Sequence, residues 1–394
     1  MYDVDPNRPT EVDLKRYTTE AQAHDYLDTL DKVAPQDSDR FLNVGVDTHS
    51  ACRSGTFIQK DSSVIHNSAC HAGVEILPIS KAVAAYDWLA EKYLWKSVAP
   101  DKDVFTAGAL KTPHEGYFIR VHAGTKVDHP IQSCLYIAKN NFSQNVHNIV
   151  IIEKGAEAHI ITGCATAPHL TSGLHVGVSE FYIEENAVLN FTMVHDWGEK
   201  VNVRPRTVTH VAAGASYISN YISLKPVGSL QMFPTTYLEG PGAVARFNSV
   251  LVAAEGAHLD VGSRVVLNAP RTRAEIISRA IAAGGRIIAR GDLVGNHPEI
   301  KAHLECKGLI LKEGLMHAVP ELSGSVPGVE MSHEAAVGKI DRREIEYLMA
   351  RGLDEEEAVS TIVRGFLNVD IEGLPEALRE KLDQAIAETQ EDMM

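Results

Sequence analysis

Residues 242–298 read GAVARFNSVLVAAEGAHLDVGSRVVLNAPRTRAEIISRAIAAGGRIIARGDLVGNHP. Turn-forming residues recur in this stretch every 14 residues, at positions 242, 256, 270, 284 and 298. Alternating polar and apolar residues follow the turns, as in Ala243–Phe247 and Ala257–Val261, which is typical of β-strands. Upstream, the turn signal recurs at steps of 28 residues, at positions 186, 214 and 242. A fixed period of this kind indicates a repeat architecture.

The period predicts a coil of about 28 residues that carries two strands, each of which pairs with its counterpart one coil away. Stacked coils of this kind form a parallel β-helix, and Gly, Asn or Pro supply its tight corners. An antiparallel sandwich also has strands every 8–12 residues, but nothing in it would keep a 14-residue step through five turns. We therefore expect a mainly β protein with a parallel β-helix core over residues 116–327.

The N-terminal flank of this core differs from it in composition and pattern. Residues 1–115 are expected to form a small α/β region. Helical segments are expected over 10–40 and 78–98, with a hairpin between them that turns at Lys60–Asp61.

The C-terminal flank is expected to be a helical domain over residues 328–394. The first helix ends at Gly352, and the second begins with a capping box made by Asp354 and Glu357. A third helix is expected to begin at Pro375. These helices cover an open end of the β-helix, provide a docking surface for a partner, or do both.

Composition and charge narrow the classes of function. The net charge of −15 comes without a Lys/Arg cluster, which argues against nucleic-acid binding because a nucleic-acid groove needs local positive potential. No run of about 18 apolar residues occurs, so we expect no membrane-spanning segment. The first residues, MYDVDPNRPTEVD, are polar and acidic and lack an apolar secretion signal. We therefore expect a cytoplasmic protein that binds neither nucleic acid nor membranes.

Five cysteines occur, at positions 52, 70, 134, 164 and 306. Their odd number and wide spacing argue against a disulfide framework. No C-x-x-C is present, so no self-contained Cys₄ zinc or iron–sulfur site is visible. The P-loop and the G-x-S-x-G nucleophile motif are also absent from the sequence.

One cysteine lies in a regular strand pattern. Residues 299–310 alternate, and Cys306 falls on the apolar face, where a free cysteine is often only a small buried hydrophobe. His333 and Glu334 are adjacent, just before a predicted helix, where they would otherwise cap the helix and face solvent. The step of 27 residues from Cys306 to His333 is close to one coil. Coil stacking would therefore bring the thiol near the His/Glu pair.

Residues 331–366, MSHEAAVGKIDRREIEYLMARGLDEEEAVSTIVRGF, resemble the C-terminal signature of the SufB and SufD proteins, the scaffolds of iron–sulfur cluster assembly. The resemblance extends to 303–310 (HLECKGLI) and 161–164 (ITGC), and it covers most of residues 115–370. It implies a right-handed parallel β-helix flanked by helical domains, in agreement with the repeat. It also implies a scaffold protein rather than an enzyme, with a transient iron–sulfur cluster formed at a subunit interface.

The resemblance further implies partners and site residues. The C-terminal helices would bind SufC, an ABC-type ATPase, and sulfur would come from a cysteine desulfurase or another donor. Cys306, His333 and Glu334 match the cluster-site residues of the family, and Cys164 matches the cysteine that receives or relays sulfur.

The signature mixes two kinds of motif. The pattern Ser-His-x-Ala-x-Val-Gly is SufD-like, and His-Glu followed by Ala is SufB-like. The Arg and Asn that SufB proteins have upstream of Thr-Gly-Cys are replaced near Tyr136 and Ala138. The mixture favours a homodimer that pairs through its β-helix, with each subunit contributing the same ligands.

Two other functions fit parts of the pattern. A SufD-like structural partner would stabilise an ATPase complex without holding a cluster, and it would tolerate Cys306→Ala. A carbohydrate-active β-helix enzyme needs paired carboxylates and sugar-stacking aromatic side chains, whereas aromatic residues make up only 6% of this chain.

Overall fold

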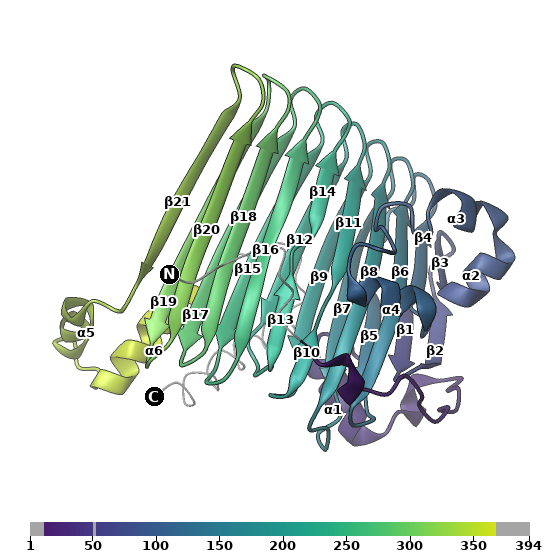
Figure 1. The fold of residues 1–394 in the computed structure, drawn as a ribbon, viewed down its shortest axis with the longest axis horizontal. Helices are drawn as coiled ribbons and strands as arrows, with labels where there is room; N and C mark the ends of the chain where they lie inside the picture. The colour runs from purple at the N-terminus through teal and green to yellow at the C-terminus, as the bar shows by residue number, and fades with distance from the viewer. Residues whose placement is uncertain (1–11, 50–52, 368–394) are drawn as a thin grey trace.

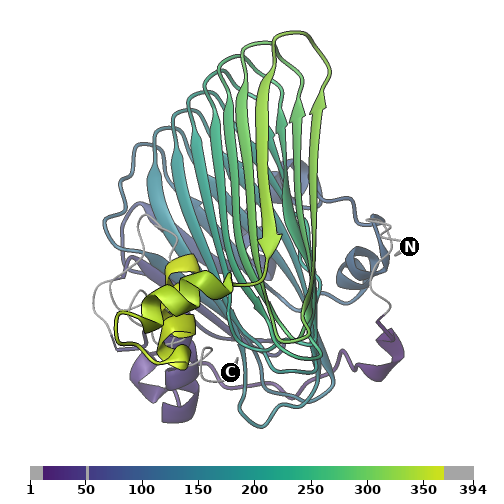
Figure 2. The same ribbon diagram turned by 90° about the vertical axis from the view of Figure 1, so that its left-hand side faces the viewer.

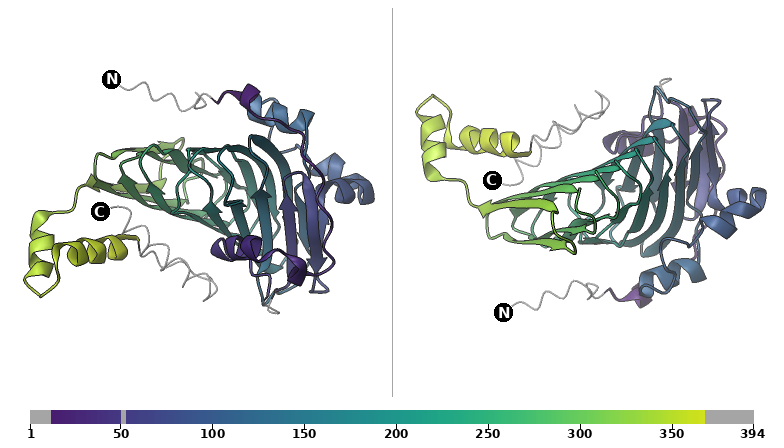
Figure 3. Two further views of the ribbon diagram at one scale, coloured as in Figure 1. Left: turned by 90° about the horizontal axis from the view of Figure 1, so that it is seen from below. Right: turned by 90° about the horizontal axis from the view of Figure 1, so that it is seen from above.

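The computed structural model describes residues 12–49 and 53–367 and shows two long sheets wound into successive coils (Figure 1). The coils form a parallel β-helix of about 8 turns, and the fold is mainly β, with 48% strand and 16% helix. The predicted fold class is therefore confirmed. The β-helix narrows from its N-terminal end toward the last coil, as the views from below and above show (Figure 3).

Two sheets face each other across the lumen of the β-helix. In the described residues, sheet 1 contains, in spatial order, β2 (Ser63–Ala69), β1 (Gly55–Lys60), β5 (Ile131–Ile137), β7 (Glu157–Thr166), β9 (Val188–Asp196), β12 (Ser216–Ser223), β15 (Val244–Ala253), β17 (Arg273–Ala283), β19 (Lys301–Leu311) and β21 (Glu330–Gly338). Sheet 2 contains β3 (Val74–Pro78), β4 (Tyr117–Val121), β6 (Phe142–Ile152), β8 (Gly173–Ile183), β10 (Val201–Val203), β11 (Arg206–Val211), β13 (Ser229–Met232), β14 (Thr235–Leu238), β16 (His258–Leu267), β18 (Arg286–Gly295) and β20 (Leu315–Gly324).

Short helices flank the sheets. The described α-helices are α1 (Pro35–Asn43), α2 (Ile79–Ala85), α3 (Asp87–Lys92), α4 (Val104–Lys111), α5 (Arg342–Met349) and α6 (Glu355–Leu367), and two 3₁₀ turns span Leu14–Arg16 and Leu30–Lys32. None of the described helices is long and apolar enough to cross a membrane.

The corners of the coils lie where the turn spacing predicts them. Asn186, Gly214, Gly242, Gly256 and Gly284 all have a left-handed backbone, with φ between +59° and +88°. Residues without a side chain, or with a short amide, tolerate this conformation, so the spacing of these residues sets the length of each strand. At the corner predicted at Pro270, the left-handed residue is the next one, Arg271, with φ +58°.

From β5 to β21, the strands of sheet 1 pair in parallel with the strand one coil later, as the repeat predicts. Val244 of β15 is in register with Arg273 of β17, which is in register with Lys301 of β19. The inner faces of the two sheets carry a continuous apolar core, and the outer face of sheet 1 carries a second apolar cluster. Helices α1 and α6 pack on this outer face, over β7 and β17, and lie on one side of the β-helix (Figure 3).

The N-terminal region is part of the sheets. The predicted hairpin is confirmed, since β1 and β2 pair antiparallel, and β1 then pairs in parallel with β5. The prediction of a helix over 10–40 is wrong for most of that segment, which is held by tertiary contacts. Leu27 N donates to Ile65 O at 2.7 Å, and His24 N donates to Ser63 Oγ at 3.0 Å. The expected helical segment 78–98 contains α2 and α3.

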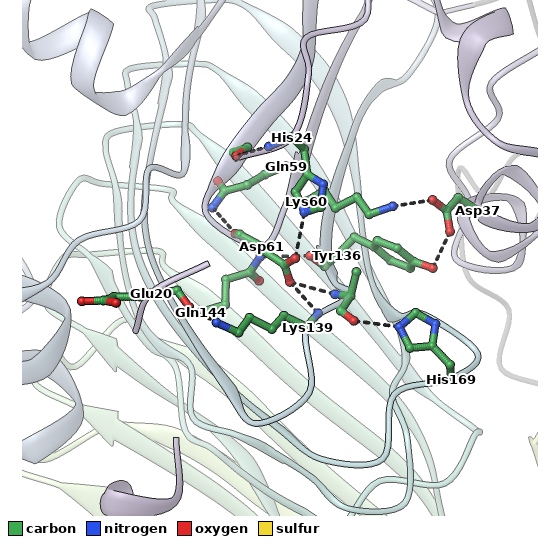
Figure 4. Close-up of polar contacts among 12 residues, drawn as sticks. Glu20, His24, Asp37, Gln59, Lys60, Asp61, Tyr136, Lys139, Gln144 and His169 are labelled. Atoms are coloured by element: carbon green, nitrogen blue, oxygen red, sulfur yellow. Dashed lines mark hydrogen bonds and ion pairs between the residues drawn. The ribbon is translucent and has the colours of Figure 1, made fainter. Parts of the chain in front are cut away.

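Buried polar groups attach this N-terminal segment to the wide end of the β-helix (Figure 4). Asp61, at the hairpin turn, accepts from His24 Nε2 at 2.9 Å and from the backbone N of Ala138 at 2.8 Å. Asp37 of α1 accepts from Lys60 Nζ and from the Tyr136 hydroxyl, both at 2.8 Å. Tyr136, through its hydroxyl, and Ala138, through its backbone N, therefore help to anchor the N-terminal segment.

The C-terminal helices follow the last strand. The predicted capping box is present, because Glu357 N donates to Asp354 Oδ1 at 2.8 Å and Asp354 N donates to Glu357 Oε2 at 2.9 Å. The third predicted helix, from Pro375, lies outside the described residues. The parallel ladder continues through β21 to Gly338, beyond the predicted core of 116–327. The division into domains at 115 and 327 stays a prediction.

Candidate functional site

Cys306 lies on β19, and its side chain faces the lumen. It is in register with Ser278 of β17 and Ala335 of β21, and it packs within the inner core with 4% of its surface exposed. Burial raises the pKa of the thiol to about 11, while the positive charge of Arg279 acts in the opposite direction. The prediction that Cys306 points toward the apolar interior is confirmed.

His333 and Glu334 lie on β21, the last strand of sheet 1, and not just before a helix as predicted. They are in register with Leu304 and Glu305 of β19. His333 therefore shares the lumen face with Cys306, and the strand spacing places their Cα atoms about 8 Å apart. Glu334, as the next residue along the strand, lies on the outer face. The pairing of β21 with β19 decides this arrangement, which local sequence does not reveal.

Charged groups surround Glu334 on the outer face of sheet 1. Lys307 Nζ lies 3.9 Å from Glu334 Oε1 and 3.3 Å from Glu305 Oε1, and Arg279 also pairs with Glu305. Burial alone would raise the pKa of Glu305, but Arg279 and Lys307 lower it overall. This ion network lies directly behind Cys306, on the other side of the same sheet.

The last coil is open. Among the described strands, β21 pairs only with β19, and β20 pairs only with β18, so both present a free edge. Figure 2, in which this end faces the viewer, shows β21 at the front with α5 and α6 to one side. Apolar side chains are exposed there, with Leu315 at 43% and Val337 at 40%. A free strand edge that carries apolar side chains is a surface for pairing with another chain.

The predicted ligands do not form one metal site within a single chain. Across residues 12–49 and 53–367, no group of three His, Cys, Asp or Glu side chains lies close enough to hold a metal ion. Cys306 and His333 come together on one face, and Glu334 lies on the other.

Cys164 lies at the opposite end of the lumen from the open edge. It sits on β7, in register with His195 of β9, and 1% of its surface is exposed. Burial raises the pKa of its thiol. The Tyr221 hydroxyl and His195 Nδ1 form a 2.8 Å hydrogen bond, and burial, with a smaller effect of His175, lowers the pKa of His195. The imidazole beside Cys164 is therefore neutral.

The polar side chains that surround Cys164 are not evident from the sequence. His175 of β8 bonds through Nδ1 to Gln144 Oε1 at 3.0 Å, and burial lowers its pKa to about 3. Trp197 packs against both His175 and His195, with ring centroids at 5.1 and 5.4 Å. Local sequence joins only His195 and Trp197, because His175 lies on β8 of the other sheet and Cys164 lies one coil earlier, on β7. Their only sequence signal is a spacing of roughly one coil between Cys164 and His195.

The remaining cysteines lie elsewhere. Cys134 is buried on the outer face of β5, in the apolar cluster that α1 covers, and Cys70 is exposed. Cys52 lies outside the described residues. Cys70, Cys134, Cys164 and Cys306 are all free thiols.

Comparisons with known proteins identify the family of this chain. The family model described as "SUF system FeS cluster assembly, SufBD core domain" matches residues 135–366. The chain belongs to the SufBD family. A SufBD family protein of Archaeoglobus fulgidus is 48% identical over 359 residues, which cover 91% of this chain and 96% of that protein.

Other SufBD relatives match over similar lengths. A SufBD family protein of Methanothermobacter thermautotrophicus (strain Winter) is 46% identical over 375 residues, covering 93% of this chain and 91% of that protein. SufB of Bacillus subtilis is 27% identical over 356 residues, covering 88% of this chain and 76% of SufB. The resemblance seen in the sequence is confirmed, and the SufBD core match includes Cys164, Cys306, His333 and Glu334.

Proposed function

We propose that this SufBD protein is the scaffold of a Suf-type complex, on which iron–sulfur clusters are assembled and then passed on, and that it is not an enzyme. The observation that carries the proposal is the pairing of a buried thiol, Cys306, with His333 on the lumen face of the open, last coil. Thiolates are the preferred iron ligands in clusters, and imidazole replaces them at some irons. A site with few thiolates suits a cluster that has to be released.

A second copy of the chain completes the site in this proposal. Two copies that meet at their open ends around a two-fold axis bury β20 and β21 and present Cys306 and His333 twice. The exposed apolar side chains of Leu315 and Val337 support contact at this end. We assign Glu334 to the rim of the interface, where an iron ion that it ligates has to displace Lys307.

The lumen supports the proposed sulfur relay from Cys164. Cys164 and Cys306 both face the lumen and are separated by five strand spacings, about 24 Å. Hydroxyl groups of Tyr221, Ser249 and Ser278 occupy the Cys306 column, and they line a cavity of about 40 Å³. In the proposed step, a persulfide donor transfers its outer sulfur to the Cys164 thiol, which becomes a persulfide while the donor leaves as a thiol. Oxidation states balance in this exchange.

The proposed ATPase partner binds α5 and α6. Tyr347 and Met349 of α5 are exposed, at 58% and 37%, while α6 buries Val363 and Leu367 against the outer cluster of sheet 1. Force applied to α6 would therefore reach β17, the neighbour of the strand that carries Cys306. We place the complex in the cytoplasm, where free thiols stay reduced.

Anaerobic reconstitution with iron and sulfide tests the scaffold role. Visible absorption and Mössbauer spectra are recorded for the wild-type chain, Cys306→Ala, and Cys134→Ala as a matched control, since Cys134 is buried on the other side of sheet 1. We expect a cluster in the wild type and in Cys134→Ala, and none in Cys306→Ala.

The other outcomes discriminate between functions. A folded dimer that binds the ATPase but forms no cluster in any variant would make the chain a SufD-like structural partner. An equal cluster in the wild type and in Cys306→Ala would keep the scaffold role and remove Cys306 from the site.

A further inference from the structure

The thiol of Cys164 is closed off from solvent. It faces the lumen, with 1% of its surface exposed. The walls of the lumen are hydrogen-bonded parallel sheets, which do not open locally without breaking their ladders, whereas corner loops open at lower cost. The corner nearest to Cys164 consists of residues 167–172, after β7, and 197–200, after β9. Access to the thiol therefore depends on this corner.

Trp197 fills the corner from the inside. Its indole has 3% of its surface exposed and packs against the rings of His175 and His195. The two loops of the corner touch each other next to Trp197: a Cβ added to Gly198, in loop 197–200, would be 3.6 Å from Leu170 O, in loop 167–172. The indole Nε1 is buried without a hydrogen-bond partner. Because an unpaired buried donor is destabilising, the indole gains a hydrogen bond to water when the corner opens.

Arg40 holds the same corner from the outside. This α1 residue donates from Nε to Thr166 O at 3.1 Å and from Nη1 to Asp196 Oδ2 at 2.9 Å. Thr166 is the last residue of β7, and Asp196, the last residue of β9, directly precedes Trp197. The Asp196 side chain is buried, while 26% of the Arg40 side chain is exposed. The guanidinium thus ties together the two strand ends that frame the corner and is itself reachable from solvent.

We infer that Trp197 is a lid over Cys164 and that the Arg40–Asp196 ion pair is its latch. Displacement of Arg40 frees the end of β9, lets the indole leave the lumen and exposes the thiol at the corner. The purpose of this lid rests on the proposed role of Cys164 as a sulfur acceptor. The lid itself is a property of the corner, and its test does not depend on cluster assembly.

Thiol labelling resolved by residue tests the lid. The full-length chain is treated with iodoacetamide at constant pH, and alkylation of Cys164 and Cys134 is followed over time by peptide mass spectrometry. The variants are Trp197→Ala and Arg40→Gln. We expect Cys164 to react about tenfold faster in Arg40→Gln, and faster still in Trp197→Ala, because each variant lowers the free energy of local opening.

Cys134 is the internal control for unfolding. It is buried on β5, in register with the residue next to Cys164 on β7, but on the opposite face of the sheet. Opening of the lid exposes Cys164 alone, whereas detachment of α1 or loss of the strands also exposes Cys134. Arg246→Gln is the matched control variant, because it removes the Arg246–Glu275 ion pair, 3.1 Å long, elsewhere on the outer face of sheet 1. It should leave Cys164 labelling unchanged.

Two results would overturn the inference. The first is that Cys164 stays as protected from alkylation in both variants as in the wild type. The second is that Cys134 becomes reactive in parallel with Cys164. Should Trp197→Ala fail to fold, the partly exposed Arg40→Gln carries the test alone. Faster labelling together with sulfur transfer that survives Cys164→Ala would leave the lid in place and remove the proposed relay role.

Discussion

The protonation state of Cys306 gives a direct test of the environment at the candidate site. Burial raises the pKa of this thiol from 9.0 to about 11, and only Arg279 acts in the opposite direction. Because the thiolate is the reactive form, the pH dependence of the alkylation rate measures ionisation. We therefore consider the alkylation rate of Cys306 as a function of pH, in the metal-free wild-type chain and in the variant Arg279→Gln.

The expected magnitude follows from the two pKa values. At pH 8 a thiol of pKa 9.0 is about 9% ionised and one of pKa 11 is about 0.1% ionised, a difference of roughly ninetyfold. Loss of the Arg279 charge should raise the pKa of Cys306 further and slow alkylation again. The neutral thiol also contributes to stability, and this contribution is complete below pH 9 and is lost as the pH rises through about 11.

Peptide-resolved alkylation rates between pH 7 and 11, compared with a small cysteine peptide as reference, provide the assay. We expect the Cys306 rate to rise about tenfold per pH unit over most of this range. A midpoint at or below pH 9, or faster labelling in Arg279→Gln, would contradict this prediction, because it would mean that the pocket stabilises the thiolate. If the prediction holds, iron loading at Cys306 has to release a proton and should quicken with pH.

Three further predictions concern the framework around the site. Glu180→Gln should speed amide hydrogen exchange in the 95–98 loop about thirtyfold, because the fully buried carboxylate accepts hydrogen bonds from three backbone N–H groups and one imidazole, and an amide would leave at least one of these donors unpaired. Unchanged exchange would contradict this prediction. Gly240→Ala should lower the free energy of unfolding, measured by urea titration, by about 1–3 kcal/mol, because the added Cβ would lie 2.0 Å from the backbone N of Ala213. In the control variant Gly108→Ala, where the added Cβ meets open space, the free energy of unfolding should not fall in this way. Val337→Asp should convert the proposed dimer to a monomer in light scattering, and a dimer mass that persists would exclude contact through β21.

Local signals in the sequence were enough to predict the coil of the β-helix and the positions of its corners. The left-handed residues at 186, 214, 242, 256 and 284 are short or lack a side chain, and such residues carry their own conformational preference. The capping box of Asp354 and Glu357 and the inward direction of Cys306 likewise follow from neighbouring residues. In each case, interactions within a few residues determine the outcome.

The position of His333 and Glu334 shows where local signals stop. Residues 330–338 form a strand because they pair with β19, and this pairing decides that Cys306 and His333 share a face while Glu334 lies on the other. The same holds for the irregular segment 17–29, which long-range hydrogen bonds hold against β2.

By itself, the sequence determined the repeat, the fold class, the family and the four candidate residues, because these depend on period, turn chemistry and a continuous motif. Only the tertiary structure decided which side chains meet. The polar cluster of His175, His195, Trp197 and Tyr221 around Cys164, and the Arg40 contact behind it, come from segments far apart in the chain. Register between coils and the packing of α1 bring them together, and a register shift of one residue would turn each strand's side chains to the other face of its sheet.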